Sequence, residues 1–349
     1  MPSPDVVHNV ALIGFGLAGK AFHAPLIATT CGLQLAAIVS SQHEEVHASY
    51  PDVANGMTYA EVLADPSVTL VVLATPDHLH AEHSLAAIAA GKHVVIDKPF
   101  APTLDEARRI ADRAKHHGTL LSIFHNRRWD ADFLTLQHLI ESGQLGDIVE
   151  FDSHFDRLRI GVGTRWKDHR GAGVWQDLGP HLVDQALVLF GLPQAVSADL
   201  AVLKPGGLAP DYAQVTLRYP ERRVTLHMSQ TRHDPTLRLS VHGTRASYVK
   251  HGLDPQEDQS KSGMVPGDPR WGFDPSDGRL VTRDAQGHAT TTTVPTLRGD
   301  YAAFYRQIAQ ALSETGPLPV TADQALSVMQ VIEAGIQSHQ QRREILLTA

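Results

Sequence analysis

The sequence has little of what marks several classes of protein. It contains one cysteine, Cys31, among 349 residues, which excludes an internal disulfide framework and is typical of a reducing compartment. It has no uninterrupted apolar run long enough to span a bilayer. Residues 1–9 carry neither the basic segment nor the apolar core of a signal peptide. We therefore expect a cytoplasmic protein without a membrane partner.

Long blocks of lysine and arginine are also missing. The formal net charge is −8 at pH 7 and the isoelectric point is about 6.2, so neither a nucleic acid nor an anionic membrane is the expected partner. A hydrophobic fraction of 42% and a charged fraction of 19% are typical of globular proteins. A chain of this length favours two domains over one.

Histidine, by contrast, is abundant, with 21 residues. The densest group is His78, His80, Glu82 and His83. It offers pairs of ligands but no further ligand at a defined spacing, as a zinc site requires. We expect no metal site.

A glycine-rich segment follows the first apolar run. Residues 9–13 lead directly into Gly14-Phe15-Gly16-Leu17-Ala18-Gly19, a complete G-x-G-x-x-G between an expected strand and an expected helix. The first glycine allows a tight turn, the second allows the backbone to approach a pyrophosphate, and the third allows close packing of helix and strand. We therefore expect a dinucleotide site that includes Gly14, Phe15, Gly16, Ala18 and Gly19.

The end of the next strand, residues 33–39, bears on the choice of cofactor. An NAD site usually has an acidic residue here that binds the ribose hydroxyls. This chain has Ser40 and Ser41, and its first acidic residues are delayed to Glu44 and Glu45. Small hydroxyl residues leave room for a 2′-phosphate, which favours NADP over NAD, although no arginine follows. Alternatively, the two serines simply begin a turn.

Two further strands end in polar turns. Residues 70–74 precede Thr75, Pro76 and His80, and residues 93–96 precede Asp97-Lys98-Pro99. The carboxyl ends of strands in open α/β sheets are where ligands bind. The backbone before a proline is restricted, so Lys98 is either held in place or is a surface lysine before a loop. The remaining elements expected in this half are helices at 81–90 and 104–117, the latter capped by Thr103, and a strand at 120–124 that ends before Asn126.

The second half changes its periodicity. Polar and apolar residues alternate roughly in several runs, which predicts a large, mostly antiparallel sheet. These runs are residues 148–155, 198–203, 212–219, 223–230 and 236–241. Residues 251–300 are rich in Gly, Pro and Asp, and we expect them to be irregular. Two amphipathic helices are expected at 301–312 and 321–341.

A short stretch inside this half carries candidate chemistry. Pro180 suits the first position of a helix over 180–190, which places Asp177 at the helix mouth and His181 in the first turn. Side chains four residues apart share one helix face, and a carboxylate beside an imidazole holds a proton-transfer group near neutral pH. The alternative is a helix cap and a buried structural histidine.

These motifs, taken in order, resemble the Gfo/Idh/MocA family of oxidoreductases over nearly the whole chain. The motifs are the glycine loop, Thr75-Pro76 with His80, Asp97-Lys98-Pro99, and Asp177-x-Gly179-x-His181-x-x-Asp184. Residues 16–25 and 252–256 are similar to the branch that contains NADP-dependent scyllo-inositol dehydrogenases. Two departures are mild: Asp97 replaces the usual Glu, and Gly171-Ala172-Gly173 replaces three glycines.

The resemblance implies a Rossmann domain at 1–125 and an α+β domain with a large open sheet at 126–349. It implies that Lys98, Asp177 and His181 form the catalytic group. It also implies that the Lys98-Pro99 turn, often with a cis proline, borders the nicotinamide, and that Thr75, Pro76, His80 and Asp97 belong to the cofactor site. Finally, it suggests sheet-to-sheet association into a homodimer or a higher homo-oligomer.

Two functions follow from these features. The first is an NAD(P)-dependent dehydrogenase or reductase acting on a polyol, inositol or sugar. Asn126 and Trp166 are expected to join Asp177 and His181 in binding that substrate, and Arg127, Trp129 and Arg165 are further candidates. The alternative is a sensor or regulator that keeps the fold and binds a dinucleotide or sugar without chemistry, and the retained Lys98, Asp177 and His181 speak against it.

Overall fold

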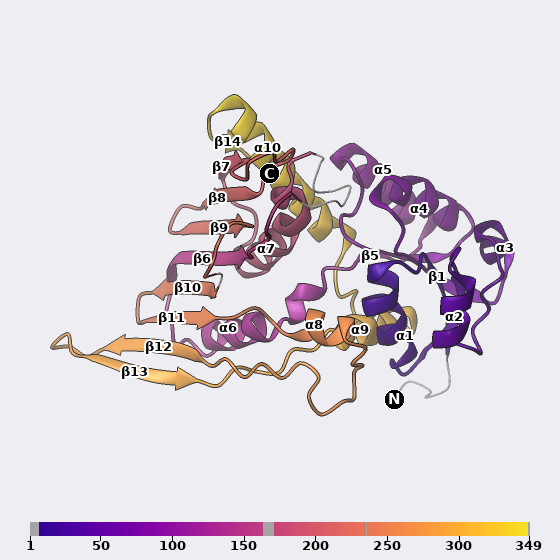
Figure 1. Cartoon of the computed structure of the whole chain (residues 1–349), viewed down its shortest axis with the longest axis horizontal. Helices are drawn as coiled ribbons and strands as arrows, with labels where there is room; N and C mark the ends of the chain where they lie inside the picture. Colours follow the sequence, from indigo (N-terminus) through magenta and orange to yellow (C-terminus); the bar gives the residue numbers. More distant parts are fainter. Residues whose placement is uncertain (1–6, 163–170, 235, 348–349) are drawn as a thin grey trace. The chain divides into compact units, whose positions relative to one another are not determined.

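The computed structural model describes residues 7–162, 171–234 and 236–347 (Figure 1). The chain divides into two compact units. Unit 1 comprises Met1–Trp129, Gln256–Trp271 and Asp300–Leu326, and unit 2 comprises Asp130–Pro255, Gly272–Gly299 and Ser327–Ala349.

Unit 1 contains a five-stranded parallel sheet in the order β2-β1-β3-β4-β5. The strands are β1 His8–Ile13, β2 Leu33–Val39, β3 Val68–Leu73, β4 His93–Ile96 and β5 Leu121–Ile123. They are almost entirely apolar and buried, as parallel strands covered on both faces must be. The predicted Rossmann sheet is confirmed.

Helices connect these strands. They are α1 Ala24–Ala28, preceded by a π-helical turn at Gly19–His23, then α2 His43–Ser49, α3 Tyr59–Ala64, α4 His80–Ala89 and α5 Leu104–His117. The predicted cap of α5 is present, because the hydroxyl of Thr103 accepts a hydrogen bond from the Glu106 amide. Gly118 ends this helix with a φ of 65°.

Two later segments of the chain also belong to unit 1. They carry α8 Gln256–Lys261 and α9 Ala302–Leu312. The hydroxyl of Tyr305 on α9 lies 2.6 Å from Nδ1 of the buried His23, and Ser122 Oγ donates to the carbonyl of Val320 at 2.7 Å. These long-range bonds, and the ion pair of Arg127 with Glu257, explain why unit 1 is built from separate stretches of the chain.

Unit 2 contains a nine-stranded sheet in the order β13-β12-β11-β10-β6-β9-β8-β7-β14. Its described pairings are antiparallel except that of β6 with β9. The predicted large, mostly antiparallel sheet is therefore confirmed. The strands are β6 Ile148–Asp156, β7 Ala195–Ala201, β8 Tyr212–Arg218, β9 Arg223–Ser229, β10 Leu237–Gly243, β11 Ala246–His251, β12 Gly278–Arg283, β13 Ala289–Val294 and β14 Ile345–Leu346.

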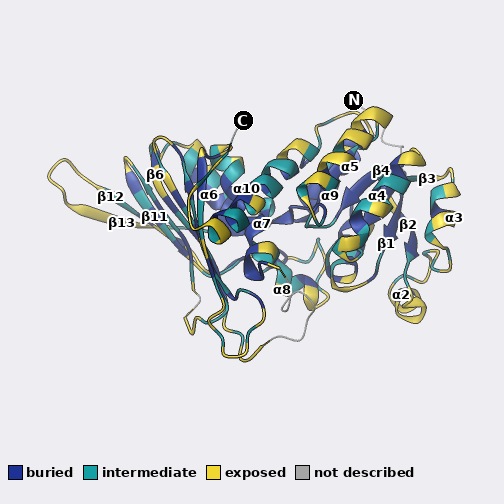
Figure 2. Cartoon of the chain, turned by 90° about the horizontal axis from the view of Figure 1, so that it is seen from above, coloured by how far each residue is buried: buried dark blue, intermediate teal, exposed yellow. Residues whose placement is uncertain are grey.

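Three helices pack against one face of this sheet: α6 Ala131–Glu141, α7 Val174–Phe190 and α10 Ala322–Gln341, the last of these from Ser327 onward (Figure 2). The fully buried ring of Trp175 belongs to this core, and its Nε1 donates to the carbonyl of Ile332. Alternate residues of β6 and β9, such as Phe151 and Leu226, point into this core. Their neighbours in the sequence therefore line the opposite face.

Two sequence-based predictions about the second half of the chain need correction. The helix that carries Asp177 begins at Val174, so Pro180 lies inside it rather than at its first position. His181 therefore lies in the second turn of the helix and not in the first. The irregular segment expected at 251–300 is irregular only in part, because it contains α8, β12 and β13. The strand β13 reads ATTTTV and is almost fully exposed, so it lacks the apolar alternation that marks a half-buried strand.

Candidate active site

The glycine loop after β1 contains glycines with different structural tasks. A Cβ at Gly14, where φ is 100°, would lie 2.5 Å from the carbonyl oxygen of Ala74, and a Cβ at Gly19 would lie 2.3 Å from that of Gly14. Gly16 is exposed, and a Cβ there would meet nothing within 4 Å. The first and third glycines thus serve backbone packing, whereas the space at the second is open to a ligand.

The neighbours of these glycines play supporting roles. Phe15 is buried and packs edge-on against Tyr50, and its carbonyl accepts a hydrogen bond from the Gln42 side chain at 3.2 Å. Ala18 directly precedes the π-helical turn. The backbone N–H groups that begin this turn provide the kind of donors that bind phosphate. The open space at Gly16 and this helix start fit a dinucleotide.

Ser40 and Ser41 lie directly beyond the carboxyl end of β2. The hydroxyl of Ser40 accepts a hydrogen bond from the Gln42 amide at 3.1 Å, which is the turn predicted as the alternative role. Ser41 is exposed. Both hydroxyl groups thus follow the carboxyl end of the second strand, the position at which this fold binds the ribose.

His80 connects the two polar turns of unit 1. Its Nε2 lies 2.9 Å from the carbonyl oxygen of Thr75, and its Nδ1 lies 2.8 Å from that of Pro99. The ring is buried, so it supports the turns after β3 and β4 rather than presenting itself to solvent. The Oγ1 of Thr75 is buried with no hydrogen-bond partner among the described residues.

Asp97 fixes the backbone that carries Lys98. Its Oδ1 accepts a hydrogen bond from the Lys98 amide at 2.9 Å and lies 3.7 Å from Nε2 of His23. Burial raises the pKa of Asp97, but the adjacent His23 ring and the charges of His23, Lys98 and His80 outweigh this, so the pKa is lowered. The Lys98-Pro99 bond is cis, as the resemblance implied. The aspartate that replaces the usual glutamate therefore still holds this turn.

Asp177 and His181 lie four residues apart on α7, and therefore on one face of it. The Asp177 amide donates to the carbonyl of Gly173 at 3.1 Å, which makes it part of the first turn. His181 is 7% exposed. Of the other predicted substrate contacts, Asn126 is buried in a 3₁₀ turn of unit 1, and Trp166, like Arg165, lies outside the described residues.

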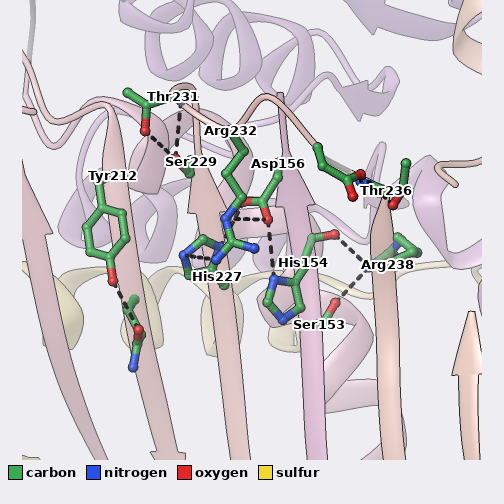
Figure 3. Close-up of polar contacts among 12 residues, drawn as sticks. Ser153, His154, Asp156, Tyr212, His227, Ser229, Thr231, Arg232, Thr236 and Arg238 are labelled. Carbon is green, nitrogen blue, oxygen red and sulfur yellow. Dashed lines mark hydrogen bonds and ion pairs between the residues drawn. The ribbon is translucent and has the colours of Figure 1, made fainter. Parts of the chain in front are cut away.

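Sequence reasoning missed a polar network on the face of the sheet opposite the helices (Figure 3). Asp156 Oδ1 lies 2.8 Å from His227 Nδ1, and Asp156 Oδ2 lies 3.3 Å from His154 Nδ1 and 3.4 Å from Arg232 Nε. Burial raises the pKa of Asp156, but these hydrogen bonds and the charges of His227 and Arg232 lower it to about 2. His154 and Asp156 lie on β6, whereas His227 and Arg232 lie on or just after β9, more than 70 residues later. The pairing of the two strands brings them together, so no sequence motif predicts the network.

His154, Asp156 and His227 also form a group of potential metal ligands, with one ligand atom of each within 4.8 Å of the others. Residues His78–His83, considered from the sequence, form no such group in the described part of the chain. In the new group the guanidinium of Arg232 already faces the carboxylate and lies 3.4 Å from Nε2 of His227. The carboxylate of Asp156 is therefore already paired with side chains of this group.

No helix in the described ranges is long and apolar enough to cross a membrane.

Comparisons with known proteins agree with this architecture. Residues 8–125 match the oxidoreductase family NAD-binding Rossmann fold, and residues 137–347 match the oxidoreductase family C-terminal alpha/beta domain, both of the GFO_IDH_MocA family. The uncharacterised oxidoreductase YdgJ of Escherichia coli is 47% identical over 97% of this chain and 98% of its own length.

Two further relatives extend the comparison. The Bacillus subtilis scyllo-inositol 2-dehydrogenase (NADP(+)) IolW is 38% identical over 97% of this chain and 96% of its own. The solved structure of YPO2259 from Yersinia pestis superimposes with a TM-score of 0.95 at 45% identity and covers 99% of this chain and 98% of that one. The chain therefore belongs to the Gfo/Idh/MocA family of oxidoreductases, with an NAD-binding Rossmann domain.

Proposed function

We propose that the protein is an NAD(P)-dependent dehydrogenase or reductase that acts on a hydroxyl or ketone group of a polyol, inositol or sugar. The observation that carries the proposal is the presence of an acid–base group in each unit: Lys98 in the turn after β4, and Asp177 with His181 on α7. The glycine loop supplies the space for the cofactor. The relatives named scyllo-inositol, D-glucoside and levoglucosan dehydrogenases support the substrate class.

The side chains divide the work of oxidising a secondary hydroxyl. A bound nicotinamide supplies the hydride chemistry. His181 accepts the hydroxyl proton and returns it in the reverse reaction. The ammonium of Lys98 polarises the same oxygen, and its backbone is fixed by Asp97. Asp177 orients one or both of these side chains.

We further propose NADP as the preferred cofactor. Ser40 and Ser41 follow β2 where an NAD site usually has an acidic side chain, and IolW is an NADP-dependent relative. A dissociation constant for NADP⁺ below that for NAD⁺, measured by fluorescence titration, is the expected result.

We also propose association into at least a homodimer through the sheet face that Asp156 and His227 line. Light scattering after gel filtration measures the mass directly, and a mass of 38.0 kDa, that of one chain, contradicts this proposal.

A substrate and cofactor panel tests the activity. Purified protein is mixed with NADP⁺ or NAD⁺ and a series of inositols, sugars and sugar alcohols, and the absorbance of the reduced nicotinamide is followed. Turnover of at least one of these compounds is expected. Tight cofactor binding without turnover of any compound, in either direction, favours the sensor over the enzyme.

A further inference from the structure

A pocket beside Asp177 lies wholly within unit 2. It is a small hollow, open to solvent on one side, and its wall includes Asp177 of α7, Lys204 and Asp211 from the connection between β7 and β8, and Gln230 just beyond β9. We propose that Lys204 and Gln230 select the substrate in this pocket by hydrogen bonding to hydroxyl groups remote from the carbon that reacts. This inference rests on the proposed function, since it places the remainder of the polyol beside Asp177.

The start of α7 is fixed against one wall of the pocket. Gly173 has a φ of 52°, and a Cβ there would lie 2.0 Å from the carbonyl oxygen of Pro210. The same oxygen accepts a hydrogen bond from the Val174 amide at 2.9 Å. The close approach requires glycine. Asp177, one turn further along, is therefore held at a defined place relative to the β7–β8 connection.

The connection itself is fixed by Asp211. Its Oδ1 accepts a hydrogen bond from the Leu203 amide and its Oδ2 one from the Lys204 amide, both at 3.0 Å. Its own amide donates to the carbonyl of Ala201, and its carbonyl accepts from the Gln230 amide at 2.9 Å. The main chain at Lys204 and at Gln230 is thus placed by the same residue. A site fixed in this way loses little conformational entropy when a ligand binds.

The two side chains form a directed pair. Lys204 Nζ donates to Gln230 Oε1 at 3.0 Å. Because a lysine can only donate, this contact assigns the amide oxygen to the lysine side and leaves the Gln230 NH₂ group as the donor on the other side. The pocket therefore presents ammonium and amide donors together with the carboxylate acceptor of Asp177. Polyols, whose hydroxyls both donate and accept, match this set.

The charges in the pocket narrow the ligand class. Among the described residues of the wall, one lysine stands against two aspartates, Asp177 and Asp211, so this part of the wall carries no excess of positive charge. These described residues do not form the cationic surroundings that recognise a phosphate or carboxylate group. The ligand expected here is an uncharged polyhydroxylated compound.

The test compares substrates with and without remote hydroxyls. Wild-type protein, Lys204→Met and Gln230→Met are assayed with NADP⁺ and either scyllo-inositol or trans-1,2-cyclohexanediol, which lacks hydroxyls beyond the adjacent carbon. Loss of a hydrogen bond to a polar partner raises KM for scyllo-inositol by about ten- to a hundredfold. The diol, which cannot make these bonds, shows the same kcat/KM in all three proteins. Lys115→Met, an exposed position on α5, is the matched control.

The outcomes separate the two proposals. A wild-type protein that turns over no polyol contradicts the proposed function and this inference with it. A wild-type protein that turns over scyllo-inositol, with KM unchanged in both pocket variants, overturns only the inference. Equal losses on inositol and diol also overturn it, because they reveal a general structural effect.

Discussion

His227 Nδ1 lies 2.8 Å from Asp156 Oδ1, joining β9 to β6 across the one parallel pairing described in the nine-stranded sheet. The carboxylate also faces His154 and Arg232 and is 1% exposed. A buried carboxylate that accepts several hydrogen bonds stabilises the fold only while it is ionised.

Asp156→Asn is expected to lower the free energy of unfolding by about 2 kcal/mol at pH 7. The pKa of Asp156 in the folded protein is about 2, below the value of about 3.9 in an unfolded chain. The contribution is therefore complete above pH 4 and is lost as the pH falls toward 2. Urea unfolding at several pH values checks this, since the difference between wild type and variant should narrow below pH 4.

Asp152→Asn is the matched control for that series. Asp152 lies on the same strand and faces the same side as Asp156, but it is not part of the network. A change within about 0.5 kcal/mol is expected for such a position. If both variants lose the same stability with the same pH dependence, the network around Asp156 is not the source.

The glycine loop offers a test that separates folding from binding. Gly19→Ala places a Cβ against the backbone oxygen of Gly14 and should cost on the order of 1–3 kcal/mol of stability. Gly16→Ala meets no atom within 4 Å and should unfold like wild type, but it occupies the space proposed for the pyrophosphate. Its dissociation constant for NADP⁺ should rise at least about tenfold, as for the loss of about 1.4 kcal/mol of binding free energy. Unchanged affinity in this variant contradicts the location of the cofactor.

His80→Ala should destabilise unit 1 by on the order of 1–3 kcal/mol, because it strips the carbonyls of Thr75 and Pro99 of a buried partner. Cofactor affinity should fall with it, since both turns border the proposed site. Thermal unfolding and NADP⁺ titration measure the two effects. His78→Ala, at an exposed position two residues away, should change neither.

Lys98→Ala and His181→Ala should each lower kcat by about a hundredfold or more, the range typical of a positioned proton-transfer group. Their dissociation constants for the cofactor should stay within about twofold of wild type, because neither side chain is proposed to hold the phosphates. Steady-state assays with the best substrate of the panel measure the first effect. Rates near wild type in both variants contradict the assigned roles.

The Rossmann half could be predicted closely because its signals are local. Residues 33–39, 93–96 and 104–117 were predicted with the bounds that β2, β4 and α5 have. Each of these signals, namely the continuous apolar runs, the capping threonine and the glycine loop, is contained in a few consecutive residues. The location of Lys98 at the end of a strand followed from the same patterns.

Other features could not be predicted because they depend on distant partners. Pro180 indicates a helix start, but the helix begins at Val174. The Val174 amide donates to the carbonyl of Pro210, which lies 36 residues later in the sequence. The support of Asp97 by His23, and of His23 by Tyr305, joins residues with no shared motif. The strand β13 lies at the edge of the sheet, and its exposed threonines carry no hydrophobic signal.

The discontinuous make-up of unit 1 has a consequence for biosynthesis. The ribosome delivers the Rossmann strands first, but Tyr305 and Val320, which bond to His23 and Ser122, emerge only after nearly all of unit 2. The nascent Rossmann segment therefore waits with an incomplete core while the large sheet is being translated. A polypeptide released after residue 129 should be prone to aggregation and chaperone binding, and limited proteolysis of ribosome-bound chains of increasing length should show protection of His23 and Ser122 arriving late.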